Sequence, residues 1–201
     1  MRKDTKALLL EQGLQLFMQK GFNNTGLQEI LACSGVPKGS FYHYFKSKED
    51  FALQVIDRYA EEGEELFREI LENRDLDPLE RLKLFFERQL TMCRELPGIR
   101  GCLIGNMTQE MGHLCETFDH CLENHWNRIC GLLAACIEEA RARDQIAKGI
   151  DAQILANFIL NSWQGALMRL KVAGNDQPLC QFMEVVFHQL LANQEAGVTA
   201  P

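Results

Sequence analysis

The sequence predicts an all-α protein made of a small N-terminal domain and a larger helical domain. Gly and Pro number only 15 and 5 among 201 residues, and the alternating apolar runs that indicate strands are scarce. Leu, Glu, Ala and Gln, which favour helices, recur throughout the chain. A chain of this length forms one large domain or two small ones that share a core. We place the boundary after residue 47, which gives domains of residues 1–47 and 48–201.

Three short helices are expected in the first domain. Thr5 is the predicted N-cap of the first, whose apolar residues recur at helical spacing until "KGF" supplies a glycine stop. Thr25 and Gln28 form a capping box that opens the second helix, "GLQEILACS", and this helix ends at Gly35. Pro37 is placed to start the third helix, "KGSFYHYF". Two short helices joined by a tight turn that contains glycine describe a helix-turn-helix.

Longer helices are expected in the second domain. Apolar residues recur at helical spacing along the first of them, and acidic side chains occupy its opposite face. The stretch "LPGIRG" separates the second of these helices from a short one. The predicted segments are 48–73, 78–95, a short helix that ends near Gly112, 115–143, 151–172 with Asp151 as N-cap, and 179–194.

Positive charge is concentrated in the first fifty residues. These hold seven Lys or Arg and five Asp or Glu, a balance of +2, whereas residues 51–201 hold 14 basic and 23 acidic residues, a balance of −9. The two balances add to the net charge of −7. A polyanionic partner is therefore expected to meet the first fifty residues, because the acidic remainder repels it.

The sequence shows neither a targeting nor a membrane-spanning pattern. No stretch approaches 18 consecutive apolar residues, and the first residues run directly into an amphipathic pattern. We therefore expect a cytoplasmic protein with no membrane partner. The eight cysteines are expected to be reduced thiols. No C-x-x-C pair occurs, so the strongest sequence signals for a zinc or thioredoxin-type site are absent.

The third helix combines the groups that a helix in the major groove of DNA needs. Its first residues offer a cation, bare backbone and a small hydroxyl for close approach, and two tyrosines and a histidine follow within two turns. Phe41 and Phe45, four residues apart, share the other face and are expected in the core. The candidates for DNA contact in this helix are Lys38, Gly39, Ser40, Tyr42, His43 and Tyr44.

Three linked pieces of the sequence, "GFNNTGLQEI", "SGVPKGSFYHYF" and "KSKEDF", resemble the DNA-binding domain of TetR-family transcriptional regulators. The resemblance implies that the second domain binds a small-molecule effector and forms a homodimer. It also implies a repressor that binds double-stranded DNA at a near-palindromic operator. A small-molecule or thiol-reactive signal would release this repressor. An activator role is the alternative.

The same resemblance implies roles for individual residues. Tyr42 and Lys48 correspond to contacts with DNA phosphates. Thr25 and Gln28, at the start of the second helix, correspond to positions that touch the DNA backbone and a base edge. The positions that would lie close to the bases are Lys38, Gly39 and His43.

The last two predicted helices are the candidates for the dimer interface. The first, "AQILANFILNSWQGALMRL", places small residues such as Ala156 and Gly165 among large apolar ones. The second, "LCQFMEVVFHQLLA", places Phe182, Val186 and Leu190 on one stripe. With the partner's copies, these helices would form a four-helix seam. The alternative is that both helices close the subunit's own core.

Cys102 is the cysteine best placed to react. A loop with two glycines delivers it to the start of a short helix, where unpaired N–H groups and the helix dipole favour a thiolate, and Arg100 adds positive charge. Through "GCL", this stretch resembles a TetR subgroup that represses genes for detoxifying reductases and senses electrophiles or oxidants. Lys171 is a further cationic neighbour if its helix lines the same cavity. The alternatives are a Cys102 that is only a small buried hydrophobe, and an effector that binds reversibly in an apolar pocket.

Metal and enzyme sites are weaker alternatives. Glu116 with His120, and Cys121 with His125, have the four-residue spacing of metal ligands on a helix, but the two pairs lie on different faces and no third ligand converges on either. We therefore expect no metal and no cofactor. An all-helical thiol enzyme would use Cys102 as nucleophile, but no histidine close by in its segment offers a base, so we do not expect an enzyme. A further alternative is a protein-interaction module that reuses the helix-turn-helix without binding DNA.

Overall fold

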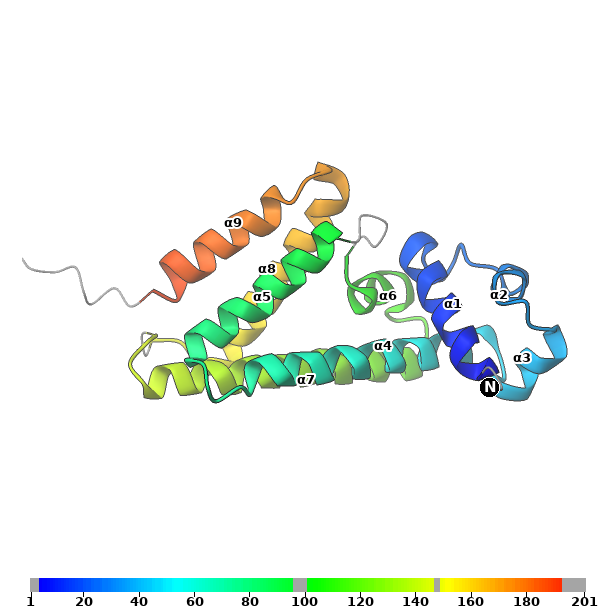
Figure 1. Cartoon of the computed structure of the whole chain (residues 1–201), viewed down its shortest axis with the longest axis horizontal. Coiled ribbons are helices and arrows are strands. Elements are labelled where there is room, and N and C mark those ends of the chain that lie inside the picture. Colours follow the sequence, from blue (N-terminus) through cyan, green and yellow to red (C-terminus); the bar gives the residue numbers. More distant parts are fainter. Residues whose placement is uncertain (1–3, 96–100, 147–148, 193–201) are drawn as a thin grey trace, which may run out of the picture. The chain divides into compact units, whose positions relative to one another are not determined.

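In a computed structural model of the chain, residues 4–95, 101–146 and 149–192 are described, and every regular element in these ranges is helical (Figure 1). The all-α prediction is therefore confirmed. Within these ranges, the helices fall short of the length and apolarity that crossing a membrane requires. The elements are α1 (Thr5–Lys20), α2 (Leu27–Ser34), α3 (Lys38–Tyr44), α4 (Lys48–Leu71), α5 (Pro78–Glu95), α6 (Leu103–Met111), α7 (Glu116–Ala142), α8 (Ala152–Ala173), α9 (Gln177–Val185) and a π-helical turn over Val186–Leu190.

Most helix boundaries follow the capping signals of the sequence. Asp151 caps α8 as predicted, because its carboxylate accepts two backbone N–H groups of the first turn at 2.9 and 3.1 Å. Gly174 ends the same helix in the left-handed conformation, with φ 70°. The bounds of α5 agree with the predicted 78–95. The last predicted helix is α-helical only to Val185 and continues as the π-helical turn, and residues 193 and 194 lie outside the described residues.

Two of the predicted caps are wrong. Asp4, not Thr5, is the N-cap of α1, and its carboxylate accepts two backbone N–H groups of the first turn at 3.0 and 3.2 Å. Thr25 does not cap α2, which begins after Gly26. The Thr25 hydroxyl instead donates to the Gly21 carbonyl, four residues earlier, at 2.7 Å, which leaves the helix start without a side-chain cap.

By their contacts, the residues form two compact units. The first unit comprises residues 1–63 with 98–125, and the second comprises residues 64–97 with 126–201. Helices α4 and α7 each contribute residues to both. The short helix α6 belongs to the same unit as α1, α2 and α3. The domain boundary after residue 47 stays a prediction.

An aromatic cluster forms the core of the first unit. Phe41 and Phe45 are buried, as predicted, with ring centroids 5.1 Å apart. Both pack against Phe51 of α4, at 5.3 and 4.9 Å. Gly13 of α1 permits this packing, because a Cβ at that position would overlap the Phe51 ring. The cluster holds α3 by one face and leaves its other face outward.

A second aromatic cluster and an ion pair made by a buried arginine hold the helices of the second unit together. Phe86, Trp163 and Phe182 pack with ring centroids 5.0 to 5.2 Å apart. Arg81 is fully buried, and its guanidinium donates to the Leu71 carbonyl and to the Glu139 carboxylate, both at 2.6 Å. These groups connect α4, α5, α7, α8 and α9 within this unit.

Candidate nucleic-acid interface

A tight turn between α2 and α3 presents α3 at the surface of the first unit. Gly35 adopts φ 65°, the left-handed region that glycine tolerates, and its N–H donates to the Leu31 carbonyl. Pro37 follows with φ −62° and stands directly before Lys38, the first residue of α3. The short helices and this turn confirm the predicted helix-turn-helix.

The outward face of α3 carries polar groups beside open space. The Lys38 Nζ lies 5.9 Å from the centroid of the Tyr42 ring, at the range of a cation–π contact. At Gly39, an added Cβ would meet no atom of the described chain within 4 Å. Exposed on this face are Lys38, Gly39, Tyr42, His43 and Tyr44, and Ser40 is half-buried. The sequence-predicted groups therefore share one accessible helix surface with room for close approach.

The two predicted contact residues near the start of α2 are placed differently from each other. Gln28 is exposed. Thr25 is 0% exposed, and its hydroxyl is already engaged with the Gly21 carbonyl. This geometry gives Thr25 a supporting role for the turn that precedes α2, and a DNA contact by its side chain stays a prediction.

Lys48, the first residue of α4, is half-buried and braces the loop after α1. Its ammonium donates to the Phe22 carbonyl at 2.6 Å and lies 4.0 Å from the centroid of the Phe22 ring. Burial lowers the pKa of this ammonium, and the carboxylates of Glu49 and Glu110 partly offset that effect. A DNA phosphate would therefore have to share or replace the bond to Phe22.

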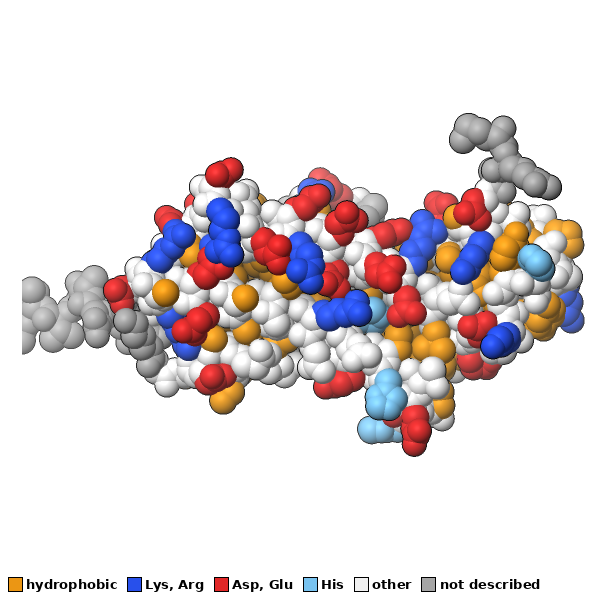
Figure 2. Space-filling view, turned by 90° about the horizontal axis from the view of Figure 1, so that it is seen from below, with side chains coloured by type: hydrophobic (Ala, Val, Ile, Leu, Met, Phe, Trp, Pro, Cys, Tyr) orange, Lys and Arg blue, Asp and Glu red, His pale blue; other side chains and the backbone are white. Residues whose placement is uncertain are grey.

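The basic charge of the protein does not gather into one patch on the face seen in Figure 2. Among the side chains coloured there, Lys and Arg are mixed with Asp and Glu. A mixed surface of this kind repels a polyanion about as much as it attracts one.

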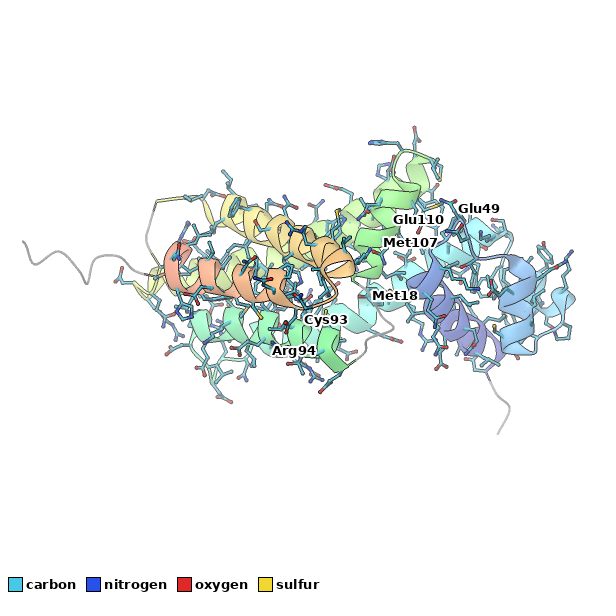
Figure 3. The ribbon with its side chains drawn as sticks, turned by 90° about the horizontal axis from the view of Figure 1, so that it is seen from above. Met18, Glu49, Cys93, Arg94, Met107 and Glu110 are labelled. Atoms are coloured by element: carbon cyan, nitrogen blue, oxygen red, sulfur yellow. The ribbon has the colours of Figure 1, made fainter. Side chains whose placement is uncertain are left out.

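Helix α6 packs against the helix-turn-helix within the first unit. The Glu110 carboxylate accepts the backbone N–H of Asn23 at 2.9 Å. The loop between α1 and α2 passes so close that a Cβ at Gly21 would overlap this carboxylate, and Gly21 also has φ 78°. Figure 3 shows Glu110 on α6 beside the start of α4, where Glu49 lies. Sequence reasoning missed Glu110, since no local pattern pairs residues 87 positions apart.

The residues predicted to sense the effector lie in different parts of the structure. Cys102 is the N-cap of α6, as predicted, and is half-buried. Arg100 lies outside the described residues. Lys171 lies near the end of α8, is half-buried and belongs to the second unit, whereas Cys102 belongs to the first. Their juxtaposition stays a prediction.

The predicted dimer helices carry an apolar face, but not the residues first expected there. Phe182 and Val186 are buried within the second unit, so they belong to the subunit's own core. The spacing of four residues places Phe182 and Val186 on one helix face, but it does not show whether that face contacts the same subunit or a partner. On α8, Gly165 is exposed as the interface prediction requires. Large apolar side chains are also exposed along α8, at Ile154, Phe158, Met168 and Val172.

One cluster of potential metal ligands brings together residues that are far apart in the sequence. Asp57 of α4 meets Cys121 and His125 of α7, and the ligand atoms of all three lie within 4.8 Å of one another. It is the only group of this kind in the part of the chain that the structure describes. The sequence showed the Cys121/His125 pair, but not the third residue.

Comparisons with known proteins agree along most of the chain. The family model for bacterial regulatory proteins of the tetR family matches residues 9–55, and the model for the Tetracyclin repressor-like C-terminal domain matches residues 78–186. The chain is 34% identical over 194 residues to the HTH-type transcriptional repressor DhaR of Mycobacterium sp. (strain GP1), with 96% of each protein covered. It is 29% identical over 176 residues to the HTH-type transcriptional repressor NemR of Escherichia coli (strain K12), covering 88% of each.

Comparison with a solved structure agrees with the sequence comparisons. The regulatory protein TetR from Rhodobacter sphaeroides superposes with a TM-score of 0.86 at 33% identity, over 92% of this chain and 98% of that one. The second domain match alone spans more than half of the chain. Together with the helix-turn-helix geometry, these similarities show that the chain belongs to the TetR family of bacterial transcriptional regulators.

Proposed function

We propose that this protein is a dimeric transcriptional repressor that binds a near-palindromic operator and releases it when the larger domain receives a signal. The observation that carries the proposal is the accessible polar face of α3, held by Phe41 and Phe45 on its buried side. DhaR and NemR, to which the chain is similar, are both named as transcriptional repressors. These relatives carry the names of regulators and not of enzymes.

In this proposal, α3 enters the major groove with its N-terminal end towards the bases. Lys38, Gly39 and His43 lie close to base edges, where the open space at Gly39 permits close approach. Tyr42 and Lys48 contact phosphates on either side. Ser40, Tyr44 and Gln28 complete the contact surface, and Thr25 supports it from beneath.

A dimer is expected because the DNA-contacting helix α3 is short. One helix of seven residues contacts too few base pairs for tight specific binding, so helix-turn-helix proteins present two copies about 34 Å or a multiple of it apart. The exposed apolar residues of α8, from Ile154 to Val172, give a surface that a second copy would cover. On α9, Val185 is a further exposed large apolar residue.

Fluorescence anisotropy on DNA from upstream of the gene tests whether α3 contacts DNA. A side chain that contacts a base contributes about 1–3 kcal/mol, and a dimer presents two copies, so Lys38→Ala should weaken binding at least ~30-fold. Tyr42→Ala should also weaken binding, with only a small loss of thermal stability because its side chain is half exposed and touches the core through Phe41 alone among the aromatic residues described. Lys83→Ala, an exposed lysine of α5, is the matched control. Unchanged affinity in both α3 variants would refute the assignment of α3 to DNA.

The signal is proposed to enter at Cys102. Its place at the N-cap of α6 favours the thiolate, and α6 is the element whose Glu110 holds the loop after α1. Modification of Cys102 would therefore act on a helix that touches the helix-turn-helix. A structure of NemR, at 27% identity and a TM-score of 0.87, covering 94% of this chain and 98% of that one, is described as the reduced form.

A thiol-reactive electrophile distinguishes this proposal from its rival. N-ethylmaleimide should release wild-type protein from DNA and leave Cys102→Ser bound, whereas Cys115→Ser, an exposed thiol outside α6, should respond like wild type. Equal release of wild type and Cys102→Ser would refute a role for this cysteine.

A reversible effector is the second candidate, and one observation favours it. Trp163 Nε1 and Gln89 Nε2 are buried donors without a hydrogen-bond partner among the described residues. Buried unpaired donors are costly, and a ligand with a carbonyl or carboxylate oxygen would satisfy the Trp163 donor, whose ring packs against Phe86 and Phe182. Trp163→Phe, which keeps the ring and removes the donor, should abolish release by such a ligand and leave electrophile-triggered release intact.

A further inference from the structure

Three potential metal ligands converge between α4 and α7 in the first unit. Cys121 and His125 stand four residues apart on α7, which places both side chains on one helix face. Asp57 reaches them from α4. Its Oδ1 lies 3.3 Å from Cys121 Sγ and 3.0 Å from His125 Nε2. The ligand atoms of all three residues lie within 4.8 Å of one another.

These separations are close to those of a tetrahedral zinc site. Zinc binds oxygen and nitrogen at about 2.0–2.1 Å and sulfur at about 2.3 Å, so tetrahedral angles place an oxygen about 3.3 Å from a nitrogen and about 3.5 Å from a sulfur. The measured 3.0 and 3.3 Å are each only a few tenths shorter. The third separation, between Cys121 Sγ and His125 Nε2, is within 4.8 Å, so binding of a cation requires the side chains to adjust around it.

The donor set selects the metal by its chemistry. A thiolate and an imidazole nitrogen suit Zn²⁺, whereas Mg²⁺ and Ca²⁺ prefer oxygen ligands only. With the thiol deprotonated, Cys121 and Asp57 supply two negative charges, which a divalent cation neutralises. His125 is 5% exposed and Asp57 is 53% exposed on its side chain, so the site is closed on one side and open to a water molecule on the other.

We propose that Asp57, Cys121 and His125 form a Zn²⁺ site with three protein ligands and a water molecule in the fourth position. The ligand atoms are Asp57 Oδ1, Cys121 Sγ and His125 Nε2. Zinc in this site ties α4 to α7 and stabilises the first unit by an amount that grows with metal concentration, because the unfolded chain does not hold the three ligands together. The proposal does not depend on the proposed repressor function.

The competing interpretation is a hydrogen-bonded trio in which the thiol and the imidazole both donate to the Asp57 carboxylate. It explains the same distances without metal. The two interpretations differ in whether the protein binds zinc with defined stoichiometry and with a sulfur ligand, so these are the properties to measure.

The test uses the full-length chain, reduced and stripped of metal with a chelator. Zinc is titrated in competition with a chromophoric chelator, and cobalt is titrated separately because it reports its ligands by absorption. We expect one zinc per chain, together with the intense visible bands of tetrahedral cobalt and a thiolate-to-cobalt charge-transfer band. Zinc should also raise the thermal unfolding temperature.

Matched variants separate the site from binding by other thiols. Cys121→Ser, His125→Gln and Asp57→Asn should each weaken zinc binding by at least roughly tenfold to a hundredfold, since loss of even an outer-sphere partner has effects of this size. Cys115→Ser and His120→Gln alter exposed residues of the same stretch outside the group and should bind like wild type. Asp57→Asn retains an exposed polar side chain of the same shape, so its loss of zinc binding does not reflect failure to fold.

Two results would overturn the proposal. One is the absence of stoichiometric zinc binding by the wild-type chain. The other is zinc binding that Cys121→Ser and Asp57→Asn leave unchanged, which would assign the metal to other cysteines.

Discussion

Replacing Glu139 by alanine should destabilise the second unit strongly, because it removes the partner of a buried charge. Arg81 is fully buried, and only Leu71 and Glu139 accept hydrogen bonds from its guanidinium at 2.6 Å in the described structure. Arg74 also pairs with Glu139. Removing one partner of a buried ion pair costs about 3–5 kcal/mol, since the other charge stays buried without compensation.

We expect a value near the lower end of this range, about 3 kcal/mol, because the Glu139 side chain is 28% exposed and water can reach the vacated side. For a chain of this size, the loss corresponds to a fall of roughly 6–12 °C in the unfolding temperature. Glu87→Ala is the control: Glu87 of α5 is 48% exposed, its partner Lys83 is 47% exposed, and their pair at 3.7 Å is a surface pair worth at most about 1 kcal/mol.

The effect should depend on pH in a defined direction. The hydrogen bond from Arg81 holds the pKa of Glu139 below its ordinary value of 4.5, with further help from Arg74 and against the effect of burial. A carboxyl with a depressed folded pKa contributes its full stability above the unfolded value and loses it as the pH falls through the folded value. Wild type and Glu139→Ala should therefore differ most at neutral pH and converge in acid.

Chemical denaturation followed by circular dichroism measures both effects, at a fixed protein concentration because dimer stability depends on concentration. A loss below about 1 kcal/mol at neutral pH, equal to that of the Glu87 control, would refute the reasoning. So would a difference between wild type and Glu139→Ala that stays constant as the pH falls below 4.5.

Three further predictions follow from the packing of the two units. Gly13→Ala should destabilise the protein by about 1–3 kcal/mol in thermal unfolding, because the new Cβ overlaps the buried Phe51 ring; an unchanged unfolding temperature would contradict the packing of the first unit. Glu110→Ala removes the acceptor that holds the loop after α1, so it should lower stability by about 1 kcal/mol and weaken signal-triggered release of DNA; release equal to wild type would exclude α6 from the coupling. Burial raises the pKa of Cys136 to about 11, so mass spectrometry should find this thiol alkylated long after the exposed Cys33 at neutral pH, and equal rates would contradict its burial.

Local signals account for the parts of the structure that the sequence predicted well. The bounds of α5, the Asp151 cap of α8 and the place of Cys102 at the start of α6 all depend on residues within a few positions of one another. The buried pair Phe41 and Phe45 follows from spacing on a single helix. Capping, glycine stops and helical periodicity act within one turn, so a single sequence contains the whole signal.

Packing between distant segments decided the rest. Phe182 joined the core of its own subunit although its stripe resembled an interface. Thr25 is buried, and its hydroxyl bonds to the Gly21 carbonyl four residues earlier instead of capping α2. In both cases an amphipathic or capping pattern fixes which residues share a face, but not which neighbour that face will meet.

The sequence by itself determined an all-helical chain, its helix-turn-helix, the exposed groups of α3 and the cysteine at the start of α6. Only the tertiary structure brought Glu110 to the loop after α1 and Asp57 to Cys121 and His125. The physical reason is the range of the interactions: backbone hydrogen bonds and caps join near neighbours in sequence, whereas a carboxylate finds a partner 64 or 87 residues away only after the helices have packed.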